Sequence, residues 1–96
     1  MMDALTKQPV SIAIEADQKD FQLYTSGVFT GACGTSLDHG VLTVGYGTMN
    51  GVDYYRVKNS WGDSWGTDGG YIYLERGNHG SDGQCGMLMS ASYPNL

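Results

Sequence analysis

Basic residues are scarce in this 96-residue sequence, in which five lysines and arginines stand against ten acidic residues and give a net charge of −5. Proteins that bind nucleic acid carry a basic stripe or patch, so we expect no nucleic-acid partner. No apolar run approaches the roughly 20 residues that span a membrane, so we expect no membrane partner either. The stretch from Met1 to Lys7 also lacks the basic and apolar segments of a signal peptide.

Cysteine is equally rare, since Cys33 and Cys85 are the two in the sequence, and the residues alone leave three interpretations open. A bridge between them would close a loop of roughly 50 residues, worth about 4 kcal/mol in chain-entropy reasoning. Cys33 could instead be a nucleophile activated by His39, although no helix precedes it to lower the pKa of its thiol. The third interpretation is zinc, but structural zinc sites usually include two cysteines two to four residues apart. Its ligands would be Cys33, His39, His79 and Cys85.

The 15 glycines and the apolar content of 41% indicate one small folded domain of short strands and tight turns. A chain of this size buries roughly 60–70% of its unfolded surface, which gives it a thin core. Apolar alternation predicts strands at 8–15, 28–30, 40–46, 52–58, 70–76 and 87–91, and a short helix within 17–24. We therefore predict a mainly β domain, with an antiparallel, barrel-like sheet of five to six strands and one short helix.

The central stretch from Cys33 to Trp65 carries the residues with the clearest chemical potential. Two strand-like runs flank the segment from Gly47 to Gly51, which contains an Asn-Gly pair typical of hairpin turns. A hairpin would bring His39, at the start of the first run, beside Asn59, at the end of the second. An amide oxygen there can hold an imidazole in one tautomer and one orientation, as a catalytic base requires. A structural histidine at a strand end and an asparagine in a turn would give the same spacing.

The residues around His39 and Asn59 distinguish a catalytic pair from a structural histidine and a turn asparagine. LDHGVLTVGYG followed by VKNSWGDSWG resembles the papain-like cysteine peptidases, especially the cathepsin L type. Further blocks fit in the same order, namely QPVSIAI, FQLY, GVF, QCG and SYP. The resemblance extends from about Ala4 to Leu96. It implies that residues 1–96 form the C-terminal lobe of an enzyme that is α+β as a whole and hydrolyses peptide bonds.

The resemblance also implies roles for particular residues, with no metal or other cofactor. His39 and Asn59 match the catalytic base and the amide that orients it, while Trp61 and Trp65 match aromatic residues that line the site. The small or apolar pocket residues imply a preference for a bulky apolar residue two positions before the scissile bond. The matched substrate-contact positions are Ala13, Leu37, Asp38, Gly40 and Ser90, and the matched disulfide cysteines are Cys33 and Cys85.

The family's C-G-[SA]-C-[WY] nucleophile block does not occur in this sequence. We therefore expect an N-terminal lobe to be missing, and the chain to be inactive by itself. The expected partners are a polypeptide substrate, the missing lobe and a proteinaceous inhibitor. A secreted or lysosomal/vacuolar location is expected for the full-length enzyme. The sequence departs from the family at residues 67–71, where a glutamate is absent and one residue is added.

Two alternatives to an enzyme lobe belong to other functional classes. One is a non-catalytic, peptidase-like binding module that associates with a protein partner. The other is a small structural protein held together by its disulfide, in which His39 has no chemical role.

Overall fold

The computed structural model describes residues 5, 8–17, 19–31, 33–34, 36–77 and 83–88. These residues contain five strands, one turn of α-helix and one 3-10 turn. In chain order the elements are β1 (Val10–Ile14), α2 (Lys19–Gln22), β2 (Val28–Phe29), β3 (His39–Met49), β4 (Val52–Lys58), β5 (Tyr71–Glu75) and η2 (Gln84–Gly86).

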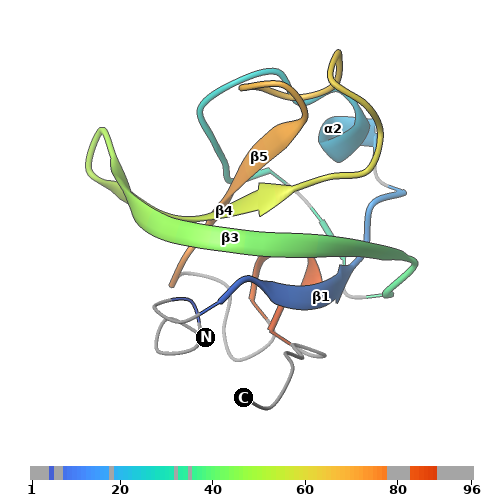
Figure 1. Ribbon diagram of the computed structural model, residues 1–96, viewed down its shortest axis with the longest axis horizontal. Coiled ribbons are helices and arrows are strands. Elements are labelled where there is room, and N and C mark those ends of the chain that lie inside the picture. Colours follow the sequence, from blue (N-terminus) through green and yellow to red (C-terminus); the bar gives the residue numbers. More distant parts are fainter. Residues whose placement is uncertain are drawn as a thin grey trace.

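The strands form one sheet in the order β1-β3-β4-β5-β2, with β3 as its longest member (Figure 1). The prediction of a mainly β fold with one short helix is confirmed. Three of the strand pairs are antiparallel, whereas β2 runs parallel to β5, so an all-antiparallel sheet was wrong for that pair. The sheet begins at β1 and ends at β2 without closing, so the term barrel-like describes it only loosely.

The expected last strand at 87–91 is not a strand where it can be followed. Met87 and Leu88 lie in a turn after η2, and residues 89–91 are outside the described residues. The described part of the chain therefore contains five strands, the lower end of the predicted range.

The β3–β4 hairpin closes more tightly than the sequence suggested. Strand β3 continues to Met49 rather than ending at Tyr46, so the turn consists of Asn50 and Gly51 alone. Both have positive φ, 52° and 81°, as the type I′ turn requires, and this turn has the twist of paired strands. A register shift between Thr43 and Gly45 lets both halves of the hairpin stay paired.

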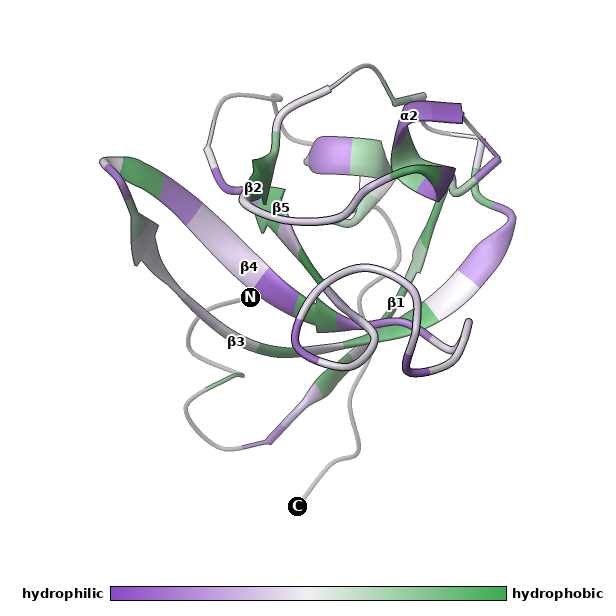
Figure 2. Ribbon diagram, turned by 90° about the horizontal axis from the view of Figure 1, so that it is seen from above, coloured by the Kyte–Doolittle hydropathy of each residue, from purple (hydrophilic) through white to green (hydrophobic). Residues whose placement is uncertain are grey.

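The core lies on one face of this sheet because alternate side chains of each strand point inward. On β5, Ile72 and Leu74 are both fully buried, as predicted from their spacing. Figure 2 shows green, purple and pale bands along β4, where the buried Tyr55 and Val57 are again two positions apart. The helical turn α2 contributes Phe21, which is fully buried.

Candidate active site

His39 and Asn59 lie together at one end of the β3–β4 hairpin. His39 begins β3 and pairs with Ile14 of β1, while Asn59 directly follows the last residue of β4. The ring nitrogen Nε2 of His39 lies 2.6 Å from Oδ1 of Asn59, a short hydrogen bond between residues 20 positions apart. His39 is half-buried, and Asn59 is only 1% exposed. The hydrogen bond expected from the hairpin therefore exists, and its catalytic role stays a prediction.

The backbone of Ser60 determines which tautomer His39 adopts. Its N–H donates to Oδ1 of Asn59 at 2.7 Å, so the amide must present its oxygen on this side. Because Oδ1 can only accept, Nε2 of His39 must be the donor in the bond between them. The neutral ring then carries its proton on Nε2, which leaves the lone pair of Nδ1 for an external group.

Two tryptophans cover this end of the hairpin, and their role as residues that line an active site stays a prediction. The indole of Trp61 lies with its ring centroid 5.1 Å from that of His39 and is tilted by 33°. Trp65 meets Trp61 edge-on and stacks on Phe21 at 5.4 Å, and its indole N–H donates to the carbonyl of Gln22. The rings join the imidazole to the core through aromatic contacts, which limits access of water to the hydrogen bond.

A hollow of about 210 Å³ opens beside the imidazole. Asp38 is held at its edge because one carboxylate oxygen accepts the N–H of Ala16 at 2.9 Å. The carboxyl of Asp17, a neighbouring wall residue, has a raised pKa, mainly because it shares a hydrogen bond with the Glu15 carboxyl. The hollow is lined by Ala16, Asp17, Gln22, Asp38, His39 and Trp61.

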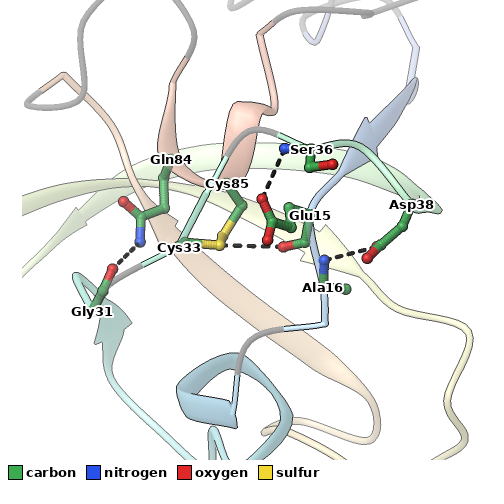
Figure 3. Close-up of a disulfide and its surroundings, with 8 residues drawn as sticks. All are labelled: Glu15, Ala16, Gly31, Cys33, Ser36, Asp38, Gln84 and Cys85. Atoms are coloured by element: carbon green, nitrogen blue, oxygen red, sulfur yellow. Dashed lines mark hydrogen bonds between the residues drawn. A yellow bond between two sulfur atoms is a disulfide. The ribbon is translucent and has the colours of Figure 1, made fainter.

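The disulfide between Cys33 and Cys85 fixes the backbone that leads into this hollow (Figure 3). The N–H of Glu15 donates to the carbonyl of Cys85, and one carboxylate oxygen of Glu15 accepts the N–H of Ser36 at 2.8 Å. Beside the bridge, the side-chain amide of Gln84 donates to the carbonyl of Gly31. With both sulfurs in the bridge, Cys33 is no nucleophile and the zinc interpretation fails.

Two of the predicted substrate-pocket residues, Ala13 and Gly40, lie on the face of the sheet opposite the core. Ala13 and Gly40 are paired across β1 and β3, and a methyl group added to Gly40 would meet nothing within 4 Å. Leu37 is half-buried, and Ser90 is outside the described residues. The structure thus brings Ala13 and Gly40 together, and the pocket itself stays a prediction.

A larger hollow, of about 470 Å³, lies along the same stretch of β1, β3 and β4. The side-chain nitrogen Nδ2 of Asn59 is buried and has no hydrogen-bond partner among the described residues. Leu42 on the same wall is 36% exposed. This hollow is lined by Ser11, Ile12, Gly40, Val41, Leu42, Lys58, Asn59 and Ser60.

Two of these features left no signal in the sequence. Ser60 acts through its backbone N–H, which every residue except proline has, so its identity revealed nothing. Asp17 lies next to Asp38 in the wall of the hollow through the pairing of β1 with β3, although 21 positions separate them. In the altered turn at residues 67–71, the Asp68 carboxylate accepts a hydrogen bond from the Tyr73 hydroxyl.

The described residues also lack two other kinds of feature. They contain no group of three or more histidine, cysteine or acidic side chains placed to hold a metal ion. No helix among them has both the length and the apolar character needed to cross a membrane.

Known proteins match this chain over nearly its whole length. The family model described as papain family cysteine protease matches residues 1–95. The probable cysteine protease RD21C of Arabidopsis thaliana is 63% identical over 91 residues, which are 95% of this chain and 20% of that protein. The KDEL-tailed cysteine endopeptidase CEP2 of the same plant is 54% identical over 94 residues, covering 98% of this chain and 26% of that protein.

The bromelain protease of Ananas comosus, solved in complex with the E64 inhibitor, superposes with a TM-score of 0.92 at 49% identity. That match covers 100% of this chain and 44% of the bromelain chain. The chain thus spans about a fifth to a quarter of the curated relatives described above.

Proposed function

Because the chain belongs to the papain family of cysteine proteases, we propose that it supplies the His39–Asn59 half of a site that hydrolyses peptide bonds. The observation that carries this proposal is the 2.6 Å hydrogen bond from Nε2 of His39 to Oδ1 of Asn59. With Nε2 committed to the amide, Nδ1 is the nitrogen that can exchange a proton with a thiol. This is the arrangement that a base in cysteine-dependent catalysis requires.

In the proposed reaction, His39 takes the proton of a cysteine thiol and the resulting thiolate attacks the scissile carbonyl carbon. A carbon–sulfur bond forms while the carbonyl electron pair moves to oxygen. When that pair returns, the carbon–nitrogen bond breaks and the His39 imidazolium gives its proton to the leaving amine. His39 then takes a proton from water as the water oxygen bonds to the acyl carbon. When the carbon–sulfur bond breaks, the carboxylic acid leaves and the imidazolium returns its proton to the thiolate. Asn59 keeps the ring oriented through these steps.

The attacking thiol must come from outside these 96 residues, because both cysteines of the sequence are joined in the disulfide. We propose that an N-terminal lobe supplies it and packs against the larger hollow at Asn59 and Leu42, which leaves the space above Gly40 for substrate. Two features support this docking surface: the buried Nδ2 of Asn59 lacks a partner among the described residues, and Leu42 is exposed on the same wall. A hydrogen-bond acceptor from that lobe would satisfy the amide, which otherwise costs about 1–3 kcal/mol.

The same proposal includes a preference for a bulky apolar residue two positions before the scissile bond. The open space above Gly40, next to its strand partner Ala13, supports it. In the full-length protein, Gly40→Val should lower kcat/KM for a phenylalanine at that position by roughly 10- to 200-fold relative to alanine. Peptide-library profiling measures the ratio, and a preferred charged residue there would contradict the proposal.

A fluorogenic peptide assay tests the function as a whole. The 96-residue chain alone should give no cysteine-dependent turnover, whereas the full-length protein should. Replacement of His39 by alanine in the full-length protein should lower kcat by about 10²–10⁴-fold, the usual contribution of a general acid–base residue. Turnover by the isolated chain, or full activity without His39, would overturn the proposal.

A non-catalytic binding module is the second candidate. The hollow beside Asn59 favours it, because this surface is open to a foreign protein. Sedimentation of the isolated chain separates the two ideas, because a stable, unmodified monomer argues against an obligatory partner. The E64 inhibitor in the bromelain structure supports inhibitors as a partner class, and a proteinaceous inhibitor is our proposal. The disulfide supports a secreted or vacuolar location for the full-length enzyme.

A further inference from the structure

The smaller hollow, next to His39, is built with charge of one sign. Of its six wall residues, Asp17 and Asp38 carry carboxyl groups, and His39 alone can become a cation. Even when His39 is protonated, two ionised carboxylates leave the wall with net negative charge. A ligand that enters this hollow therefore meets a field that favours a positive group.

The two carboxyl groups are held in place by independent contacts. Asp38 donates its backbone N–H to the carbonyl of Ile14 and accepts the N–H of Ala16 through its side chain. Asp17 is exposed and follows Ala16 directly, and its carboxyl shares a hydrogen bond with that of Glu15. Glu15 is itself tied to the backbone N–H of Ser36. The acidic side of the hollow is therefore fixed before any ligand arrives.

An aromatic face completes the hollow. The indole of Trp61 is 37% exposed and lies beside the imidazole of His39. The methylene stem of a lysine or arginine can pack on such a ring while its charged end reaches a carboxylate, and the ring face attracts the cation as well. A neutral apolar side chain of equal length would gain the packing but not the charge interaction.

We propose that this hollow receives a lysine or arginine as the first residue after the scissile bond, and that Asp17 is a specificity-determining residue. The inference rests on the proposed function, because the hollow borders the imidazole that would protonate the leaving amine. Trp61 lines the same hollow as His39, so we place the side chain on that amine beside its indole. Both carboxyl groups are exposed, and Asp17 is the one that can be replaced without removing the acceptor that Asp38 provides for the N–H of Ala16.

A binding experiment tests the inference without any turnover. The dipeptide amides Lys-Gly and norleucine-Gly mimic the released product and differ only in the side-chain ammonium group. Titration into the 96-residue chain, followed through the indole N–H of Trp61 and the ring protons of His39 by NMR, gives both dissociation constants. We expect lysine to bind about fivefold more tightly, a preference that Asp17→Asn reduces to about twofold and Asp17→Glu retains.

A matched control removes the same charge far from the hollow. The control is Asp53→Asn. Asp53 pairs with Thr48 at the opposite end of the hairpin, roughly 30 Å from His39 along β3. This variant should leave the lysine preference unchanged. Equal binding of the two dipeptides to the parent chain, or an equal loss in both asparagine variants, would overturn the inference.

Cleavage by the full-length protein provides the second readout. Peptides with lysine or norleucine after the scissile bond should differ about fivefold in kcat/KM, and Asp17→Asn should reduce that ratio. If turnover occurs with no lysine preference, the inference fails while the proposed function stands. If the dipeptides show the lysine preference but no peptide is cleaved, the proposed function fails and the cation-binding hollow stands.

Discussion

The two ends of the β3–β4 hairpin each depend on an asparagine, but for different reasons. At the turn, Asn50 is exposed and adopts a positive φ next to Gly51, which is a local backbone property. At the other end, Asn59 is buried and its side chain meets a histidine 20 positions away. A local sequence rule covers the first end, whereas the second exists only when the strands pair in register. The following experiments separate the two.

Loss of the disulfide should have the largest effect on stability. A Cys33→Ser, Cys85→Ser double variant frees a loop with a sequence separation of 52, which costs about 4 kcal/mol in chain-entropy terms. Urea unfolding of the isolated chain measures the loss. The effect should be strongest at the His39 end, because the bridge holds the Cys85 carbonyl that accepts the N–H of Glu15. A loss below 1 kcal/mol would show that the core alone maintains this end.

Replacement of the buried asparagine should impair chemistry more than the turn asparagine does. In the full-length protein, Asn59→Ala removes the acceptor that holds His39, and hydrogen bonds to charged groups contribute about 1.5–3 kcal/mol. This corresponds to a decrease of roughly 10- to 150-fold in kcat/KM. Asn50→Gly, which tolerates the same positive φ, is the control and should leave kcat/KM unchanged. Equal kinetics for both variants would remove Asn59 from the proposed mechanism.

A smaller effect is expected at the turn. Gly51→Ala places a side chain at φ 81° and should destabilise the chain by about 1 kcal/mol. Gly40→Ala is the matched control, because an added methyl group meets nothing within 4 Å at either glycine and only Gly51 has a positive φ. Thermal or urea unfolding compares them. Equal losses would mean that crowding or strand propensity, rather than the turn conformation, decides the cost.

The smallest effect concerns charge at the His39 end. Because a hydrogen bond to Glu15 raises the pKa of Asp17 above its ordinary value of 3.8, the folded chain holds this proton more tightly than the unfolded chain. Stability should therefore fall as pH rises from about 3.8 through the raised pKa. Above that window, Asp17→Asn should melt at a higher temperature than the parent, and the difference should vanish below it.

Asp53→Asn provides the comparison at the turn end. Asp53 accepts a hydrogen bond from Thr48 and lies 3.9 Å from the Arg76 guanidinium, so loss of its charge should not raise the melting temperature. A similar increase in both variants would attribute the effect to the net charge of −5 rather than to the contact between Asp17 and Glu15.

Much of the fold followed from short-range patterns. The Asn50–Gly51 pair predicted the hairpin, and the alternation of Ile72 and Leu74 predicted a strand with one buried face. The parallel pairing of Val28–Phe29 with β5 was not predictable in this way, because a two-residue strand has no pattern that reveals its direction. The length of β3 was underestimated because Gly47 resembles a turn residue and yet pairs with Tyr54.

The candidate site divides along the same line. The sequence by itself determined which imidazole, amide and indoles belong to the site, because a motif is defined by the identity and order of its residues. It also determined the tight turn, because φ preferences are local. Only the tertiary structure decided that the Ser60 N–H fixes the tautomer of His39, and that Asp17 joins Asp38 beside it. The physical reason is that the positions of backbone donors and of neighbouring charges depend on strand register and loop closure. Every residue except proline has the same backbone N–H, so residue identity does not show where that donor points.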